Sequence, residues 1–292
     1  MYKAIATNKR NTILIMAVFV GLISVVGWVV SYLYGNTNIT YYVIIGAGLY
    51  AWLQYYIATK LTIAMTGAKQ IEKRDNPRFY RIVENLAITT GMQTPKIYII
   101  DDPAPNAFAT GRDPKHAIVA ATTGLIDIMN DSELEAVMAH EMGHVQNYDI
   151  RVGMITFGLV SAIGFLTDIV LRIMFFGNNR DSENNSPIVM IVGVIVLILA
   201  PIIAVIVQMA VSRQREYLAD VTSAMTTRNP DSMISALEKL RTQGRPMKRQ
   251  NGASAHLFFS NPLKPGFAGK LFSTHPPLED RIARLRNNAN KF

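Results

Sequence analysis

Two long stretches without a charged side chain constrain this chain more than any other feature of its sequence. No Asp, Glu, Lys or Arg occurs between Arg10 and Lys60, and none occurs between Glu183 and Arg213. A helix of about 20 predominantly apolar residues crosses the hydrocarbon core of a bilayer. Both stretches are long enough for such helices, so the sequence predicts an integral membrane protein.

Four apolar runs are long enough to cross a bilayer. The third run carries Asp168 and Arg172, which lie four residues apart on one helix face and can pair. We interpret this pair as one that extends toward the membrane interface, with a cavity inside the protein as the alternative. The first run is too long for a cleaved signal peptide. The predicted spans are Ile13–Tyr34, Ile39–Ala58, Val152–Phe176 and Ile188–Val211.

Lys and Arg are distributed unevenly around these runs, and this asymmetry predicts the orientation. Three basic residues precede the first run and four lie within residues 60–74, whereas residues 35–38 hold none and residues 177–186 hold one Arg against two acids. We therefore predict that the basic segments face the cytoplasm. The predicted parts are a transmembrane hairpin at 1–59, a cytoplasmic part at 60–151, a second transmembrane hairpin at 152–212 and a second cytoplasmic part at 213–292.

Short patterns outside the apolar runs predict three amphipathic helices. They follow the pairs Asn76-Pro77, Asn229-Pro230 and Pro276-Pro277, because Asn caps a helix and proline fits its first turn. The stretch 244–269 is rich in Gly, Pro, Asn and basic residues. We predict that it is a mobile loop and the first place that a protease cuts.

A small sheet is predicted between the first two of these helices. Ile97–Ile100 is a short apolar run that is typical of a strand. Asn106–Thr110 and His116–Ala121 flank a turn of Gly, Arg, Asp and Pro, and together they predict an antiparallel hairpin.

The composition limits the partners and metal ligands. The chain has no cysteine, so a metal must be held by His and carboxylate side chains. The net charge of +8 is not accompanied by any nucleic-acid-binding motif. We therefore expect no nucleic-acid partner, and we assign the basic flanks to the anionic inner leaflet of a lipid bilayer.

The pentapeptide from His140 to His144 is the most informative motif. Its two histidines share one face of a helix, because a helix turns once in about 3.6 residues, and both imidazoles can reach one ion. Glu141 lies on an adjacent face and can hold a water molecule at that ion. The same spacing can occur by accident on a solvated helix, but only five histidines occur in the chain, and two of them are these.

The helix that carries this motif has its own local signals. Ser132 and Glu135 are interpreted as its capping box, and Glu133 lies in the electropositive first turn. Gly143 lowers helix stability, so its presence indicates that another backbone approaches closely. If the helix continues into the apolar run that follows, His144 lies eight residues, or about 12 Å, from the predicted span.

A catalytic zinc ion usually has a third protein ligand. Glu216 is the candidate in the stretch Arg215–Asp220, and Asp220 lies one helical turn further along. Asp220 can accept the second imidazole proton of a metal-bound histidine. An ordinary surface Glu and a helix-stabilising Asp are the alternative, which the presence of the His140 motif disfavours.

These motifs resemble the HtpX family of membrane zinc proteases, which are related to the CAAX prenyl proteases. The resemblance rests on the His140–His144 motif, on Arg215–Asp220 and on Asn106–Gly111, and it runs over most of the chain. It implies a gluzincin domain with one zinc ion and Glu216 as the third ligand. It also implies quality control of unfolded or damaged membrane proteins in the bacterial cytoplasmic (inner) membrane, as part of a stress response.

The resemblance further implies roles in substrate binding and catalysis. Asn106, Ala107 and Phe108 would hold the substrate backbone beside an edge strand. His275 would stabilise the transition state. Arg281, one turn beyond it, can orient that histidine.

The predicted fold is therefore an α+β, mainly helical integral membrane protein. About four transmembrane helices accompany a gluzincin-like zinc protease domain that contains a small antiparallel sheet. Glu141 is the expected general base in metal-assisted peptide hydrolysis. A prenyl-peptide-type protease, an inactive membrane scaffold and a transporter remain as alternatives.

Overall fold

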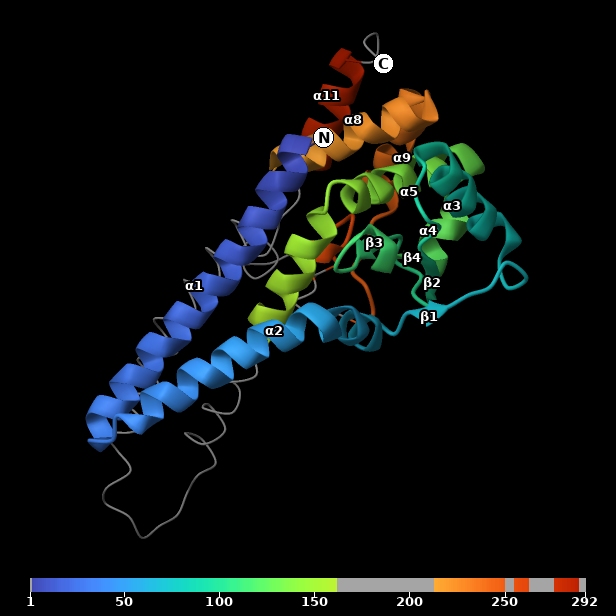
Figure 1. The fold of residues 1–292 in the computed structure, drawn as a ribbon. Helices are drawn as coiled ribbons and strands as arrows, with labels where there is room; N and C mark the ends of the chain where they lie inside the picture. Colours follow the sequence, from blue (N-terminus) through green and yellow to red (C-terminus); the bar gives the residue numbers. More distant parts are fainter. Residues whose placement is uncertain (1, 162–212, 250–254, 263–275, 289–292) are drawn as a thin grey trace.

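The computed structural model describes residues 2–161, 213–249, 255–262 and 276–288. Most of the described chain is helical, as predicted (Figure 1). Residues 149–161 also form a helix. Two short 3-10 helices occupy Pro114–His116 and Ala255–Leu257. The longer helices are α1 (Tyr2–Tyr34), α2 (Asn38–Thr66), α3 (Pro77–Thr90), α4 (Thr123–Ile128), α5 (Asp131–Gln146), α8 (Arg213–Thr227), α9 (Pro230–Gln243) and α11 (Leu278–Asn288).

The sheet has four strands in the order β1-β2-β4-β3. They are β1 (Lys69–Gln70), β2 (Lys96–Ile100), β3 (Ala107–Thr110) and β4 (Ile118–Thr122). The antiparallel hairpin of β3 and β4 is confirmed. The prediction of a purely antiparallel sheet is wrong, because β4 inserts between β3 and β2 and runs parallel to β2. Strand periodicity identifies strands but does not define which strands are neighbours.

Local signals placed all three amphipathic helices correctly, and α11 begins directly after Pro276-Pro277. The Asn76 side chain accepts a hydrogen bond from Phe79 N at the start of α3, and α3 ends at Gly91, where φ is +65°. The Asn229 side chain caps α9 in the same way through Ser232 N. In each case the Asn side chain satisfies a backbone N–H that the first helical turn leaves free.

The start of α5 corrects the prediction. Its capping box consists of Asn130 and Glu133, and not of Ser132 and Glu135. The Asn130 Oδ1 atom accepts from Glu133 N at 2.9 Å, and Glu133 Oε2 accepts from Asn130 N at 2.8 Å. Lys239 Nζ, on α9, lies 2.6 Å from Glu133 Oε2. Asn130 and Glu133 have the same spacing as Ser132 and Glu135, so spacing alone does not distinguish the two possible caps. The ion pair between Glu133 and Lys239 supports the cap at Asn130.

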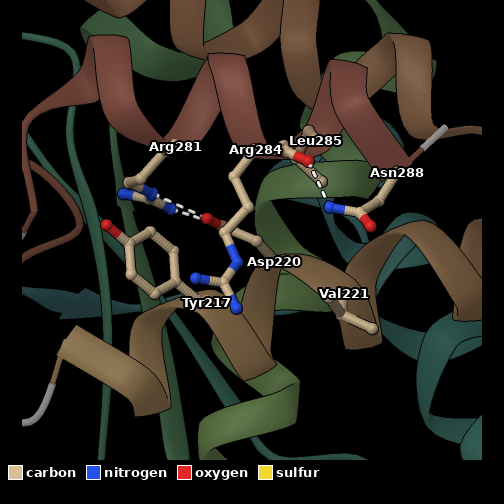
Figure 2. A pocket seen from close by; sticks show the side chains of 7 residues that line it. All are labelled: Tyr217, Asp220, Val221, Arg281, Arg284, Leu285 and Asn288. Atoms are coloured by element: carbon tan, nitrogen blue, oxygen red, sulfur yellow. Dashed lines mark hydrogen bonds and ion pairs between the residues drawn. The ribbon is translucent and has the colours of Figure 1, made fainter.

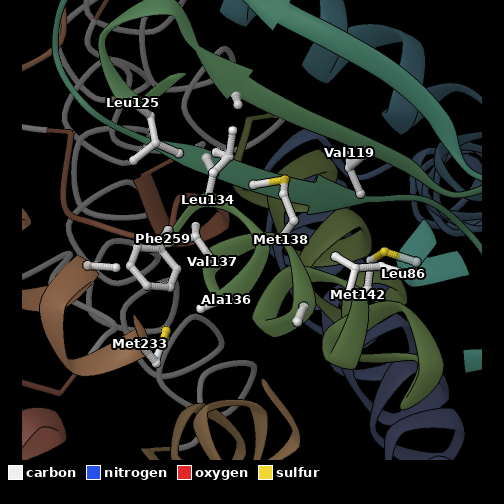
Figure 3. Close-up of a cluster of buried hydrophobic side chains, with 14 of the residues drawn as sticks. Leu86, Val119, Leu125, Leu134, Ala136, Val137, Met138, Met142, Met233 and Phe259 are labelled. Atoms are coloured by element: carbon white, nitrogen blue, oxygen red, sulfur yellow. The ribbon is translucent and has the colours of Figure 1, made fainter. Parts of the chain in front are cut away.

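The core of the domain lies around α5, which packs against α3, α8 and α9 and against the sheet (Figures 1 and 3). Leu134, Val137, Met138 and Met142 are fully buried on this helix. Burying a large apolar side chain stabilises a fold by about 1.5–3 kcal/mol. The helix that carries the histidine motif is therefore held by packing on several sides.

α5 does not continue without a break into the next apolar run. The helix ends at Gln146, and Tyr148 adopts a left-handed conformation with φ of +61° before helix resumes at residue 149. Left-handed backbone is uncommon for a residue with a side chain. After this turn, Val152, Met154, Ile155 and Leu159 are buried in an apolar cluster with side chains of α1 and α2.

Two predicted spans fall on α1 and α2, which form a helical hairpin that projects from the domain (Figure 1). Within the described residues, one segment, Ala6–Val25 of α1, is long and apolar enough by composition to cross a membrane. The run Val152–Phe176 is described only to residue 161, and the run Ile188–Val211 lies outside the described residues. The presence of four spans therefore stays a prediction.

Part of the predicted loop 244–269 packs into the protein. Met247, Ala255, Phe258 and Phe259 are all buried. These residues therefore pack against the domain, and the mobility of the stretch and its early cleavage by a protease stay predictions. Their apolar side chains overrule the loop-like composition around them, because buried apolar surface stabilises the folded position.

Candidate metal centre

Two helices bring three candidate ligands together. His140 and His144 come from α5 and Glu216 comes from α8, and one ligand atom from each lies within 4.8 Å of the others. The two histidine Nε2 atoms are 3.1 Å apart, and they lie 3.6 Å and 3.5 Å from the Glu216 carboxylate oxygens. Ligand atoms around a tetrahedral metal with bonds of about 2.0–2.2 Å lie roughly 3.3–3.6 Å apart. The spacing of these atoms fits a metal ion.

Hydrogen bonds to the outer nitrogens define the tautomers of both histidines. Asp220 Oδ1 lies 2.9 Å from His140 Nδ1, and Asp149 Oδ2 lies 3.0 Å from His144 Nδ1. Each Nδ1–H donates to its carboxylate, which leaves the Nε2 lone pair free. Two lone pairs and a carboxylate then face one point. The two Nε2 lone pairs and the Glu216 carboxylate repel one another unless a cation lies between them.

The carboxylates around the site favour positive charge. Burial alone would lower the pKa of His144, but Glu216 and Asp149 outweigh it and raise that pKa to about 9. Burial would likewise raise the pKa of Asp220, but Arg281 and His140 hold it down at about 2. The pKa of Asp149 is also below its usual range, because His144 and Arg215 oppose the effect of its burial. The site is built to hold a proton or a metal cation at its centre.

Arg281 contacts Asp220, the carboxylate partner of His140. Its guanidinium is fully buried, and its Nη2 and Nε atoms lie 2.6 Å and 2.9 Å from the Asp220 carboxylate (Figure 2). This bidentate pair locks Asp220 against His140. The prediction that Arg281 orients His275 is untested, because His275 lies outside the described residues. The structure gives Arg281 a contact with the partner of a ligand.

Glu141 lies on α5 between the two histidines in sequence, and its side chain is buried. Its charge contributes to the raised pKa of His144, which places the carboxylate in the electrostatic field of the site. A buried carboxylate next to two metal-ligating imidazoles is suited to accept a proton during hydrolysis.

The tight neighbour of Gly143 is a side chain of α8, and not the backbone that was expected. A Cβ atom at this position would lie 3.3 Å from the Thr222 side chain on α8 and 3.8 Å from the Cα atom of Ala219. Contacts at 3.3 Å are tighter than those of most real Cβ atoms. The glycine therefore lets α8 approach α5 closely enough for Glu216 to reach the histidines.

The predicted substrate-binding residues lie at the edge of the sheet, but that edge is covered. Phe259 N donates to Ala107 O at 2.8 Å, and Ser260 N donates to Asn106 Oδ1 at 3.0 Å. Phe108 and Phe258 form an antiparallel bridge. The backbone of β3 therefore pairs with the chain's own residues 258–260.

Sequence reasoning missed three residues that contact the site or its supports. Asp149 holds His144, and Asn8 on α1 donates to Asp149 Oδ1 at 2.6 Å. The Phe259 ring lies 4.9 Å from the His140 ring. An Asp five residues after a histidine is a weak signal without knowledge of the turn at Tyr148. The contacts of Asn8 and Phe259 join parts of the chain more than 100 residues apart.

Comparisons with known proteins agree with this geometry. The family model for Peptidase family M48 matches residues 73–289. A Protease HtpX homolog of Tropheryma whipplei is 54% identical over 292 residues, which cover 100% of both chains. A second, from Streptococcus gordonii, is 42% identical over 98% of this chain and 99% of the relative.

The fold is also similar to a solved structure, that of S. mikatae Ste24p. The TM-score is 0.50 at 18% sequence identity, and the match covers 98% of this chain and 67% of the other. At that identity the likeness concerns the fold alone. The family match and the full-length relatives confirm the resemblance stated from the motifs: this chain belongs to peptidase family M48, with the HtpX proteases as its relatives.

Proposed function

We propose that the chain is a membrane-bound zinc metalloendopeptidase that cleaves misfolded or damaged membrane proteins at the cytoplasmic membrane surface. The observation that carries this proposal is the convergence of His140, His144 and Glu216, with a carboxylate behind each histidine. Two imidazoles and one carboxylate are the ligand set of gluzincin-type catalytic zinc sites, which keep a fourth position open.

The donor set fits zinc. Cysteine is absent from the chain, and the two Nε2 atoms and the Glu216 carboxylate have tetrahedral spacing. Zinc held by these residues would lower the pKa of a bound water and polarise the carbonyl of the peptide bond. Asp220 and Asp149 would keep both histidines in the tautomer that zinc needs.

Residues of the chain would then transfer protons, stabilise the transition state and bind the substrate. The Glu141 carboxylate would accept a proton from the attacking water and pass it to the amine that leaves. His275 would donate a hydrogen bond to the carbonyl oxygen as negative charge develops on it. Asn106, Ala107 and Phe108 would hold the substrate backbone as an added strand on β3, once residues 258–260 release that edge.

The helical hairpin supports a membrane location. Large apolar side chains are exposed along α1 and α2, among them Trp28, Tyr42, Ile45 and Trp52. A soluble monomer rarely exposes an apolar surface of such extent. Lipid would cover these side chains, and Trp and Tyr are the side chains that are enriched at the membrane interface.

Basic side chains gather where α2 returns to the domain. A cavity of about 380 Å³ is lined by Lys60, Lys96, Arg112 and Lys115, and no carboxylate is among its lining residues. Anionic lipid headgroups of the inner leaflet attract such a basic surface. This supports the proposal that the domain lies on the cytoplasmic side.

Hydrogen bonds connect the candidate metal centre to α1 of the helical hairpin. Asn8 Nδ2, on α1, donates to Asp149 Oδ1 at 2.6 Å and to Asn147 O at 2.8 Å. Asp149 in turn holds His144. A site attached to a membrane helix in this way favours substrates that are held close to the bilayer.

Two substitutions and one control test the proposal. Glu216→Gln should lose zinc, because it removes a ligand, whereas Glu141→Gln should retain zinc and lose turnover. Glu135→Gln, on the same helix but outside the ligand set, is the matched control and should retain both. Zinc is measured by elemental analysis, and cleavage is measured on an unfolded membrane protein. Full zinc content in Glu216→Gln would contradict the ligand assignment.

A labelling experiment tests the orientation, because the cysteine-free chain is a suitable background. A single cysteine at Asn36 should react with an impermeant thiol reagent added outside the cell. A cysteine at Ser254 should react only after the membrane is opened. The opposite pattern would refute the cytoplasmic location of the site.

A further inference from the structure

We propose that residues 258–260 are a built-in competitor for substrate, and that the pocket filled by Phe259 selects a large apolar side chain of the substrate. This inference rests on the proposed protease function and adds a substrate class to it. An extended peptide with an aromatic or similarly large apolar residue would replace the internal segment at β3.

The first support is the pairing of the segment with an edge strand. β3 is the last strand of the sheet, so one of its two edges is open to a further strand. Phe259 N donates to Ala107 O at 2.8 Å, and the Phe108–Phe258 bridge is antiparallel. One edge can pair with only one strand at a time. A substrate strand on β3 and the internal segment therefore exclude each other.

The second support is the use of Asn106. Its side chain accepts from Ser260 N at 3.0 Å and donates to Ser260 O at 2.8 Å. Both hydrogen bonds go to backbone atoms, so any residue of an incoming peptide can make them. The Asn106 amide holds the internal segment through the same groups that every peptide substrate presents.

The third support is the position of the Phe259 side chain. The ring is 1% exposed, packs edge-on against the His140 ring with centroids 4.9 Å apart, and lies 4.5 Å from the Arg281 guanidinium. Figure 3 shows the ring facing α5 near Val137, in the main apolar cluster. A substrate side chain in this position would lie directly beside a metal ligand, and hence beside the bond to be cleaved.

The pocket accepts this ring for a physical reason. The ring belongs to the main apolar cluster and lies against the His140 ring of α5, and the cation of Arg281 covers the ring face. A buried cation over an aromatic face attracts it by about 2 kcal/mol or more in dry sites, a preference that aliphatic side chains do not share. Aromatic residues should therefore be preferred over smaller apolar ones, and charged residues should be rejected.

A proline substitution tests the competition while the Phe259 side chain is kept. Ser260→Pro removes the N–H that donates to Asn106 Oδ1, while the side chain at 259 is retained. Losing one net hydrogen bond should shift the equilibrium between the paired and the released segment roughly 2- to 10-fold toward release. KM for an aromatic peptide substrate should fall by a similar factor while kcat and zinc content stay unchanged. Gln93→Pro, in an exposed coil away from the site, is the matched control.

A binding experiment gives a readout that does not need turnover. The labelled octapeptide Ala-His-Leu-Phe-Phe-Ser-Asn-Pro, which has the sequence of residues 255–262, is titrated into full-length zinc-loaded protein that carries Glu141→Gln. Anisotropy should show tighter binding when Ser260→Pro is added to that background. The same peptide with Ser in place of its second Phe should bind at least 10-fold more weakly.

The outcomes separate the two proposals. Absence of zinc or of cleavage in the wild-type protein refutes the proposed function itself. Wild-type cleavage together with an unchanged or higher KM in Ser260→Pro refutes the competitor, as does a peptide that binds equally with and without its second Phe. A lower KM and Phe-dependent binding support both the competitor and the assigned pocket.

Discussion

Removing Asp149 should weaken metal binding, although Asp149 is not itself a proposed ligand. Its carboxylate lies 3.0 Å from His144 Nδ1 and is also held by Asn8 at 2.6 Å and by Arg215 at 3.5 Å. In Asp149→Ala, His144 keeps its place on α5 but loses the acceptor that holds its Nδ1–H. The imidazole can then rotate or change tautomer, and its Nε2 lone pair is presented to the metal for less of the time.

The size of the loss follows from the type of contact. Removing the hydrogen-bond partner of a metal-bound histidine typically costs about 10- to 100-fold in metal affinity, which corresponds to roughly 1.4–2.7 kcal/mol. Asp149 also helps to raise the pKa of His144 to about 9, so it favours the proton that competes with the metal. The measured loss should therefore be larger at alkaline pH than at neutral pH.

Zinc affinity is measured on purified protein by competition with a fluorescent chelator. Asp113→Ala is the matched control, because Asp113 Oδ1 lies 2.7 Å from His116 Nδ1 in an exposed pair that is separate from the three ligands. The control should bind zinc like the wild type. Wild-type affinity in Asp149→Ala at both pH values would refute the reasoning that the His144 tautomer is set by this carboxylate.

Three further predictions follow from the same groups. Arg281→Met should destabilise the protein by about 3–5 kcal/mol in chemical unfolding, because it leaves the buried Asp220 carboxylate without its cation; a change below 1 kcal/mol would contradict this. Zinc binding at pH 7 should release a proton from His144, whose pKa of about 9 keeps it protonated in the metal-free protein, and calorimetry in buffers of different ionisation enthalpy measures that proton. His275→Ala should retain zinc and KM while kcat falls roughly 100- to 1,000-fold; zinc loss would place His275 among the ligands instead.

The ligand pair on α5 could be read from spacing alone, because helical geometry is local. Residues four apart share a face in any helix, so the positions of His140 and His144 required no knowledge of the rest of the chain. The caps of α3 and α9 were predictable for the same reason, since Asn side chains bond to their own first turns. Glu216 was a candidate only because its motif was interpreted together with the first one.

Two of the corrections concern contacts between distant segments. The parallel neighbour of β4 depends on where the hairpin inserts. The buried position of Phe259 depends on a pairing with β3 across about 150 residues. Neither of these leaves a local periodicity in the sequence.

The sequence by itself therefore determined the amphipathic helices, the three longer strands, the apolar hairpin and the candidate ligands. Hydrophobic periodicity, caps and ligand spacing are properties of a few neighbouring residues, and they act in the same way in any fold. Only the tertiary structure decided which groups support and occupy the site, such as Asp149 behind His144 and Phe259 beside His140. These contacts arise from the packing of segments that are far apart in the chain, where many pairings satisfy the local rules and the burial of the whole core selects one.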